Sequence, residues 1–437
     1  MADAAAVLGP LLAREQRRVV ALLARQLGLA ELALAEDAVQ TAALRALERW
    51  PRDGTPERPA AWLYQVARHW ALDQLRTAGR HVSLPDDDAG LLPPLPPPTG
   101  RFAGELDDDE LALLFAACHP ALPPATQVLL ALRSGAGLTL AQLAPLLFTH
   151  EAALAQRLAR ARRRLAGEAV ALPAGAELAP RREAVLTALA LAFHQGQLAA
   201  GRAGAPASPD AAPAHEACWE AIRLARALAA HPAVAAPEAD ALAALLLLHG
   251  ARLSGRIDDH GDPIPLAGQP RERWDAGMIR LGLAHLQASQ RGAALSRWHL
   301  QAGIAAEHAM APRPEATRWP VIVRYYEMLL ALDPSDAPRL GHAIALAEAG
   351  QPGPARERLL ALLPTLPAAL RAHGLAALSR AAEHEGALAD ASTWLAQAVA
   401  HAPDAAQARV LQARLQRLQA HGPGLRAVGP AAAPGRG

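Results

Sequence analysis

Arginine side chains recur at three- and four-residue spacing in residues 151–165, EAALAQRLARARRRL. In a helix, this spacing places Arg157, Arg160 and Arg164 on one side, while Leu154 and Leu158 lie on the other. Guanidinium groups on one helix face can pair with the phosphate oxygens of a nucleic-acid backbone, and the first residues of such a helix can enter a major groove. The pattern therefore predicts nucleic-acid binding.

The residues just before this helix predict a second, shorter helix. Thr139 and Gln142 have the spacing of a capping box, which satisfies free amides at the start of a helix. A turn at residues 148–150 then separates the two helices, which together have the pattern of a helix-turn-helix motif. An amphipathic helical hairpin with a solvated arginine face would give the same pattern and stays open as the alternative. The apolar stripe of the first helix is Leu140, Leu143, Ala144 and Leu147.

The charge of this region limits how tightly it can bind DNA by itself. Residues 106–168 contain six arginines and six acidic residues, so the segment is neutral although its charges are segregated. Each neutralised phosphate contributes about 0.9 to the salt dependence of binding, so about three to five arginine contacts give only modest affinity. We therefore expect the protein to bind DNA together with a larger partner.

Other groups of reactive side chains are better explained by structural roles than by catalysis. Residues 258–262, DDHGD, do not have the spacing of an EF-hand or a zinc site, and a polar turn accounts for them. Cys118 and His119 are adjacent, so a helix would point them in different directions, and Cys118 is expected to be buried. No P-loop, nucleophile elbow or dinucleotide fingerprint occurs. We therefore expect that the protein is not an enzyme and that it binds no metal ion and no cofactor.

The composition indicates a helical protein of the cytoplasm. The 437 residues include 43 basic and 42 acidic residues, and all 43 basic residues are arginine. Alanine and leucine dominate, and they are the best helix formers, so the expected fold class is all-α. Two cysteines cannot form a disulfide framework, which favours a reducing compartment. Residues 1–18 lack a basic signal-peptide start, and no long uncharged apolar run occurs, so we expect neither secretion nor a membrane span.

Proline-rich breaks divide the chain into helical segments. Pro334, Pro367 and Pro403 follow helix-like segments at spacings of 33 and 36 residues, which bracket the 34-residue period of a TPR helix pair. Ordinary helical hairpins would give the same spacing. The expected organisation is two helical domains at 1–82 and 106–168, a proline-rich acidic linker at 83–105, a helical extension at 177–310, TPR-like repeats at 311–421 and a disordered tail at 422–437.

Two segments of the first domain resemble region 2 of bacterial sigma factors of the extracytoplasmic-function (ECF) type, which belong to the sigma-70 family. Residues 32–50 resemble the acidic helix AEDLVQ-x-x-FLRAL of that family, and residues 60–80 resemble its AWL-x-x-IAR-N-x-A-x-D-x-LRR helix. The arginine-bearing helix-turn-helix pattern then falls where region 4 of the family is expected. The matching residues are Ala35, Glu36, Asp37, Val39, Gln40, Leu44, Arg45, Ala46 and Leu47 in the first segment, and Ala61, Trp62, Leu63, Ala67, Arg68, Ala71, Asp73, Leu75 and Arg76 in the second.

The resemblance implies partners and roles for particular residues. Region 2 would bind the clamp of core RNA polymerase and the minus-10 element of promoter DNA, and region 4 would bind the minus-35 element and the polymerase flap. Residues 50–59 resemble the segment that receives an extruded base, and the linker with residues 86–88 would run towards the RNA exit path. The implied residues are Asp37, Gln40 and Arg45 for polymerase, Arg68, His69 and Arg76 for the minus-10 element, and Gln156, Arg157, Arg160 and Arg164 for the minus-35 element.

Several residues depart from the family pattern. Pro145 falls inside the first helix of the helix-turn-helix pattern, where proline removes a hydrogen bond and typically costs about 3 kcal/mol. His69 replaces the usual asparagine and Thr41 the usual acidic residue, while Ala153 and Ala155 occupy positions that are often polar. These departures concern minus-35 selectivity more than the fold.

Segments between residues 114 and 309 resemble a subgroup of the family that carries a long helical, TPR-like C-terminal extension. We expect this extension to regulate the sigma module, either by intramolecular contact or by binding a regulatory protein, because helical repeats usually present concave protein-binding surfaces. A helical-repeat adaptor with a degenerate sigma-like half is the alternative function, and an enzyme is a more remote one.

Overall fold

The computed structural model describes residues 2–78, 108–134, 138–147, 149–168, 170–202, 211–258 and 260–421. Within these residues the chain consists of α-helices and short 3-10 helices, and it forms no strand beyond one isolated antiparallel bridge between Ile257 and Pro263. The prediction of an all-α fold is confirmed. The predicted linker at 83–105 and the predicted tail at 422–437 lie outside the described residues.

The chain divides into two compact units. The first unit consists of Met1–Gly196 and Glu216–Ala239, and the second unit consists of Gln197–His215 and Asp240–Gly437. The first unit therefore contains both predicted N-terminal domains together with the beginning of the predicted extension.

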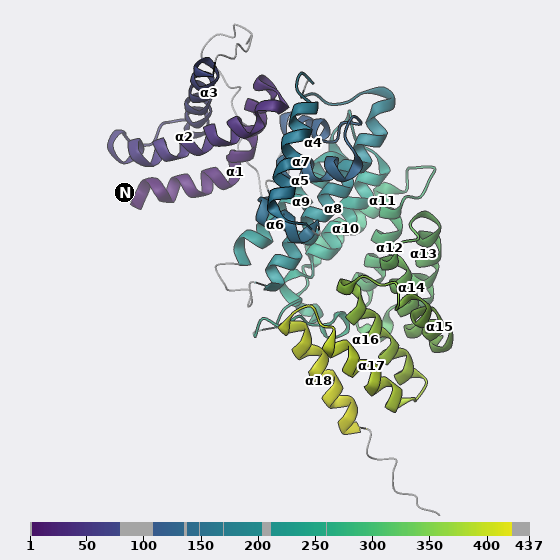
Figure 1. Ribbon diagram of the computed structural model, residues 1–437. Helices are drawn as coiled ribbons and strands as arrows, with labels where there is room; N and C mark the ends of the chain where they lie inside the picture. Colours follow the sequence, from purple (N-terminus) through teal and green to yellow (C-terminus); the bar gives the residue numbers. More distant parts are fainter. Residues whose placement is uncertain are drawn as a thin grey trace, which may run out of the picture. The chain divides into compact units, whose positions relative to one another are not determined.

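Three long helices open the first unit (Figure 1): α1 (Ala2–Leu27), α2 (Leu32–Asp53) and α3 (Pro59–Thr77). Helix α2 packs against both α1 and α3. Its buried face consists largely of alanines, including Ala35 and Ala42, which let the neighbouring helices approach closely. Trp50 at the end of α2 meets Trp62 of α3 edge to face, with ring centroids 5.6 Å apart. Helix α2 continues to Asp53, so the first four residues of the 50–59 segment are helical rather than a loop.

Four shorter helices follow in the first unit: α4 (Asp108–Ala117), α5 (Pro124–Ser134), α6 (Leu140–Leu146) and α7 (Glu151–Arg164). The predicted capping box at the start of α6 is present, because Thr139 Oγ1 accepts from the amide of Gln142 at 3.2 Å and Gln142 Oε1 accepts from the amide of Thr139 at 2.8 Å. Leu143, Leu154 and Leu158 are buried where α5, α6 and α7 meet.

Two further helices contribute to the first unit: α8 (Leu178–Arg202) and α9 (Ala211–Ala230). Cys218 of α9 is buried, and its thiol donates to the carbonyl oxygen of Phe193 in α8 at 3.5 Å. The predicted extension is thus part of the hydrophobic interior of the first unit from its beginning.

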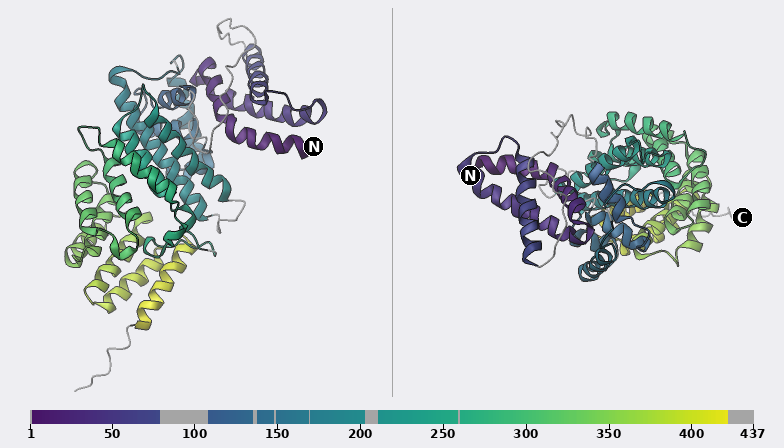
Figure 2. Two further views of the ribbon diagram at one scale, coloured as in Figure 1. Left: turned by 180° about the vertical axis from the view of Figure 1, so that it is seen from behind. Right: turned by 90° about the horizontal axis from the view of Figure 1, so that it is seen from above.

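The second unit contains most of α10 (Pro237–Gly250) and the helices α11 (Ala276–Ser289), α12 (Arg297–Met310), α13 (Trp319–Leu332), α14 (Asp336–Glu348), α15 (Pro352–Leu362), α16 (Ala368–His384), α17 (Leu388–Ala400) and α18 (Ala405–His421). From α12 onwards, each helix packs against the next one in the chain. These helices form successive hairpins, drawn from green to yellow in Figure 2.

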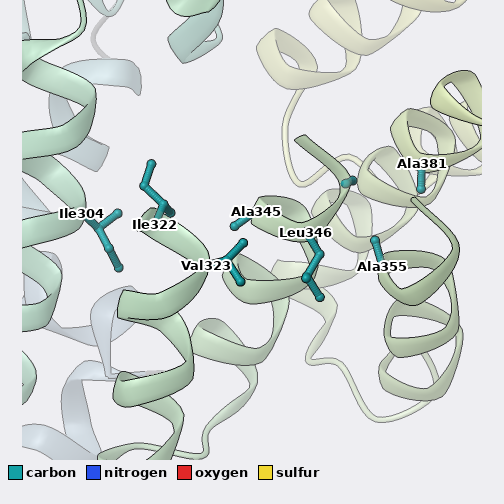
Figure 3. Close-up of a cluster of buried hydrophobic side chains, with 8 residues drawn as sticks. Ile304, Ile322, Val323, Ala345, Leu346, Ala355 and Ala381 are labelled. Carbon is teal, nitrogen blue, oxygen red and sulfur yellow. The ribbon is translucent and has the colours of Figure 1, made fainter. Parts of the chain in front are cut away.

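The helical hairpins of the second unit pack through several clusters of buried apolar side chains. Figure 3 shows one cluster, in which Ile304 of α12, Ile322 of α13, Leu346 of α14 and Ala381 of α16 are buried in sequence along the stack. Close packing depends on small residues: a Cβ atom at Gly341 of α14 would lie 2.5 Å from the ring of Tyr326 in α13. Helices α13, α15 and α17 begin 33 and 36 residues apart, the same spacings as the three prolines.

Candidate nucleic-acid interface

Helix α7 separates its polar and apolar side chains as the sequence predicted. Gln156, Arg157 and Arg160 are exposed, while Leu154 and Leu158 are buried. The helix begins at a side-chain cap, in which Nδ1 of His150 accepts from the amide of Ala153 at 3.2 Å. The exposed face of α7 can therefore present amide and guanidinium donors to an anionic partner.

A depression of about 330 Å³ lies between α7 and the beginning of α5. Apolar atoms form much of its wall, and three guanidinium groups are among its lining. A hollow of this kind suits a phosphate group, because guanidinium groups bind phosphate oxygens with charge-assisted hydrogen bonds. The lining residues are Leu122, Pro123, Thr126, Arg157, Arg160, Ala161 and Arg164.

The arginines of α7 do not all have the same environment. Arg164 uses Nε to donate to the carbonyl oxygen of Ala121 at 2.9 Å, so it fixes the loop between α4 and α5. Arg162 is half-buried, and burial lowers the pKa of its guanidinium while the nearby Glu36 opposes that shift. Arg157 and Arg160 have no such ties among the hydrogen bonds and ion pairs of the described residues, and they are available to a ligand.

Glu36 of α2 connects the first three helices to α5 and α7. Nη2 of Arg133 in α5 donates to Oε2 of Glu36 at 2.8 Å, although the two residues are 97 positions apart in the sequence. Burial raises the pKa of Glu36, and the charges of Arg133 and Arg162 oppose this shift. The glutamate is therefore an internal contact, whereas its neighbour Asp37 is exposed.

A second ionic network joins three helices of the first unit. Glu220 of α9 lies 3.0 Å from Nη1 of Arg17 in α1 and 2.6 Å from Nη2 of Arg223, which in turn donates to Glu110 of α4 at 2.9 Å. Although burial raises the pKa of Glu220, its hydrogen bond to Arg223 and the charges of Arg17 and Arg223 outweigh this and lower it overall. We call these four residues the α1–α4–α9 network.

Pro145 lies in the last turn of α6, one residue before the helix ends at Leu146. The amide of Leu147 still donates to the carbonyl oxygen of Leu143 at 2.9 Å, and the amide of Thr149 donates to Ala144 at 3.0 Å. Proline removes one hydrogen bond near a helix end, where fewer such bonds remain to be lost. Pro145 therefore lies near the end of a short helix rather than in the middle of a long one.

The residues predicted to contact the minus-10 element lie on α3. His69 and Arg76 are exposed, and Arg76 pairs with Asp73 one turn earlier at 3.1 Å. Nε of Arg68 is 3.4 Å from Oε1 of Gln26 in α1, and Nε2 of Gln26 donates to the hydroxyl of Tyr64 at 2.7 Å. This chain of hydrogen bonds orients Arg68.

Helix α2 exposes a mixed apolar and polar face. Leu44 and Leu47 are 62% and 44% exposed, and Asp37, Gln40 and Arg45 are exposed beside them. Neighbouring exposed apolar side chains that are surrounded by polar residues can mark a protein-binding surface. The three residues predicted to bind polymerase thus lie on one accessible helix together with two apolar anchors. Both leucines match the family pattern of this helix, but only Asp37, Gln40 and Arg45 were predicted from the sequence to bind polymerase.

The remaining candidate groups are structural. Burial raises the pKa of the Cys118 thiol to about 12, so it stays protonated. In the 258–262 turn, Asp258 Oδ1 accepts from the amides of His260 and Asp262, and Asp262 forms an ion pair with Arg409; Asp259 lies outside the described residues. The described part of the chain holds no group of three or more histidine, cysteine, aspartate or glutamate side chains suited to a metal ion. None of its helices is long and apolar enough to span a membrane.

Comparison with known proteins identifies two segments. Residues 11–81 match the sigma-70 region 2 family, and residues 181–290 match a family of unknown function, DUF6596. The first match covers α2 and α3 and most of α1, so the N-terminal helices form a sigma-70 region 2 domain and the resemblance found in the sequence is confirmed at this level. No solved structure matches the chain.

The chain is also 36% identical over 397 residues to an uncharacterized protein of Rhizobium meliloti (strain 1021), covering 89% of this chain and 91% of that protein. A protein with a sigma-70 region 2 domain has a sigma-factor-like role in transcription initiation, with core RNA polymerase and promoter DNA as partners. The chain belongs to the same family as the Rhizobium meliloti protein, and the similarity extends through the segment that follows region 2.

Proposed function

We propose that this protein is a sigma factor of the ECF type, which binds core RNA polymerase in the cytoplasm, directs it to promoters and catalyses no reaction itself. The observation that carries the proposal is the sigma-70 region 2 match over residues 11–81. The exposed basic face of α7, which follows the capped helix α6, supports a second DNA-binding domain of the helix-turn-helix kind, corresponding to region 4.

The exposed face of α2 would dock on the polymerase clamp. Leu44 and Leu47 supply apolar area, and Asp37, Gln40 and Arg45 supply polar contacts that set the orientation. A few residues carry most of the binding energy of a protein interface, and a charge placed among its buried apolar side chains should weaken binding.

DNA contact would be divided between α3 and α7. Arg68, His69 and Arg76 of α3 would meet the minus-10 element, and Gln156, Arg157 and Arg160 of α7 the minus-35 element, with Arg164 holding the edge of the depression. Separating about a dozen base pairs, at about 1.4 kcal/mol per stacking step, requires about 15 kcal/mol. A few arginines cannot supply this, so polymerase must share in melting the DNA.

The proposal is tested by copurification with core RNA polymerase and by runoff transcription from a promoter library. We expect the wild-type chain to copurify, and Leu44→Glu to weaken binding at least tenfold, because a carboxylate replaces an apolar anchor. Leu360→Glu is the matched control, since Leu360 of α15 is also an exposed helical leucine, at 44% exposure, and lies outside region 2. Failure of the wild-type chain to bind polymerase would disprove the proposal.

We also propose that the C-terminal extension regulates the sigma module. The α1–α4–α9 network supports this, because Glu220 and Arg223 of the extension pair with Arg17 of region 2 and Glu110 of the proposed region 4. Elements centred at minus 10 and minus 35 are about 25 base pairs, or about 85 Å, apart along B-form DNA. The 2.8 Å hydrogen bond between Glu36 and Arg133 holds region 2 against the proposed region 4. The two domains would therefore have to separate before one binds the minus-10 element and the other binds the minus-35 element.

The hairpins of the second unit would form TPR-like repeats that bind a regulatory protein. Three helices of this unit begin at spacings of 33 and 36 residues, which is close to the TPR period. In this scheme, a partner bound to the repeats would favour either the closed or the open arrangement of the sigma module.

A helical-repeat adaptor with a degenerate sigma-like half is the second candidate function. The short helix α6, which contains Pro145 and ends at Leu146, is the observation that favours it, because a helix-turn-helix motif depends on its first helix to position the second. Such an adaptor would not support runoff transcription with core polymerase, so the same experiment separates the two functions.

A further inference from the structure

A group of basic and aromatic side chains surrounds Trp274 in the second unit. The Cζ atom of Arg271 lies 4.5 Å from the centroid of the Trp274 ring, and the Cζ atom of Arg252 lies 5.8 Å from it. Both residues come from turns that pack together, the 3-10 helix η5 (Arg271–Arg273) and the segment between α10 and the 3-10 helix η3 (Leu253–Gly255). We call Arg252, Arg271 and Trp274 the Trp274 cluster.

The charge of this cluster is not balanced by the groups nearest to it. Arg252 is only 9% exposed, and its Nη2 is 2.7 Å from Nδ1 of His249, which is not an anion. Burial, followed by the charges of Arg256 and Arg271, lowers the pKa of Arg252 to about 10. Burial also lowers the pKa of Arg271, which only the charge of Glu315 opposes. Buried cations normally have an anionic partner, because desolvating an unpaired charge is costly.

The neighbouring histidine does not supply the negative charge that the two arginines lack. Burial, together with the charges of Arg252 and Arg271, lowers the pKa of His308 to about 4, so its ring is neutral at pH 7. Nη1 of Arg271 donates to the carbonyl oxygens of His308 at 2.8 Å and Ala311 at 2.7 Å, which caps the end of α12. These two hydrogen bonds use only Nη1 of Arg271. They do not involve its Nε or Nη2 atoms.

Two buried donors in the cluster have no acceptor. Trp274 is 7% exposed, and among the described residues neither its Nε1 nor the buried Nε of Arg271 has a hydrogen-bond partner. Gly255 allows its backbone to pack closely against the edge of the indole, because a Cβ atom there would lie 3.3 Å from Trp274 Nε1. Most buried donors in proteins are satisfied, and an unpaired donor is a position where a bound water, ion or ligand could supply the acceptor.

We propose that the Trp274 cluster binds a phosphate-type oxyanion, either inorganic phosphate or the phosphate of an ester. Two guanidinium groups and an indole N–H supply donors only, which excludes a cationic or purely hydrogen-bond-donating ligand. A doubly charged oxyanion also offers enough acceptor atoms for several donors at once, and planar guanidinium groups bind such oxygens in pairs.

The test uses the purified full chain without polymerase, so its outcome is independent of the sigma-factor proposal. Binding is measured by calorimetry and by thermal unfolding with inorganic phosphate, pyrophosphate and, as a control, chloride at constant ionic strength. We expect phosphate or pyrophosphate to raise the unfolding temperature in a saturable way and chloride to leave it unchanged. No saturable effect of either phosphate compound would overturn the proposal.

Two variants locate the site. Arg252→Met keeps an apolar stem beside Trp274 but removes the charge, and it should weaken binding at least tenfold while leaving the ligand-free protein folded. Trp274→Phe keeps an aromatic ring without the Nε1 donor and should weaken binding several-fold. Arg273→Met is the matched control, because Arg273 is an exposed arginine of the same 3-10 helix. Equal binding by wild type, Arg252→Met and Trp274→Phe would mean that phosphate binds elsewhere.

Discussion

Arg160 and Arg164 lie one helical turn apart on α7 and line the same depression, but their contacts differ. Arg164 is tied to the carbonyl oxygen of Ala121, whereas Arg160 projects towards solvent. A charge that only meets a ligand can be removed without affecting folding, while a charge that also holds a loop cannot. The two residues should therefore respond differently to the same substitution.

We predict that Arg160→Gln reduces the salt dependence of promoter binding by the holoenzyme, with a slope smaller by about 0.9, because one phosphate contact is lost. The thermal stability of the protein should not change. Arg164→Gln should lower the unfolding free energy by about 1 kcal/mol, because it removes a charge-assisted hydrogen bond to the backbone. Salt titrations of promoter affinity and urea unfolding measure the two effects, and identical behaviour of the two variants would contradict this division of roles.

These residues also show what the sequence could predict about the site. Three- and four-residue spacing placed the arginines on one face of α7 and the leucines on the other, because helical periodicity is local. The hydrogen bond between Arg164 and Ala121 joins residues that are 43 positions apart, and no periodic sequence pattern predicts such a contact. For the same reason, the sequence could not predict that Glu36 is an internal contact while Asp37 is exposed.

Helix α6 has only seven residues and contains a proline, so its capping box is important for its stability. Short helices are marginal by themselves because nucleation is costly, and the cap satisfies amides that would otherwise be unpaired. Packing of Leu143 in the interior supplies the rest. The orientation of α7 depends on α6, since the two helices pack against each other.

We predict that Thr139→Ala lowers the unfolding free energy by about 1 kcal/mol, because it removes the cap of α6. Thr41→Ala is the control, since the hydroxyl of Thr41 donates within α2 to the carbonyl oxygen of Asp37 and caps nothing. Urea unfolding compares the two. If Thr41→Ala destabilises the protein as much as Thr139→Ala, the capping box is not the source of the effect.

The fold class, the capped helix α6 and the arginine-bearing helix α7 followed from composition, periodicity and capping residues, because these signals act over a few residues. The way in which the helices pack into units could not be predicted from these local signals. The first unit includes most of α8 and α9, which the sequence placed in a separate extension, and the contact between Cys218 and Phe193 is one of the buried contacts that join these helices. The Trp274 cluster likewise combines residues from separate turns that show no shared sequence pattern.

At the scale of the whole molecule, two ionic contacts hold the helices of region 2 close to α4 and α5, and they differ in strength. Burial raises the pKa of Glu36, which means that its charge is poorly stabilised in the folded state despite Arg133. The pKa of Glu220 is instead lowered, so its charge is stabilised there. A group with a lowered pKa contributes stability above its unfolded-state pKa, and that contribution is lost as the pH falls through the folded-state value. At pH 7 the α1–α4–α9 network therefore contributes more than the Glu36 pair.

We predict that Glu220→Gln destabilises the protein by about 2–3 kcal/mol at pH 7, because Arg17 and Arg223 lose a buried anionic partner. Glu36→Gln should cost less than about 1 kcal/mol, since it also removes a poorly solvated charge. If the network keeps the sigma module closed, Glu220→Gln should increase runoff transcription several-fold at limiting protein, whereas Glu357→Gln, at an exposed position of α15, should not. Unchanged transcription together with the expected loss of stability would show that α9 only supports the fold, and regulation through this network would then be rejected.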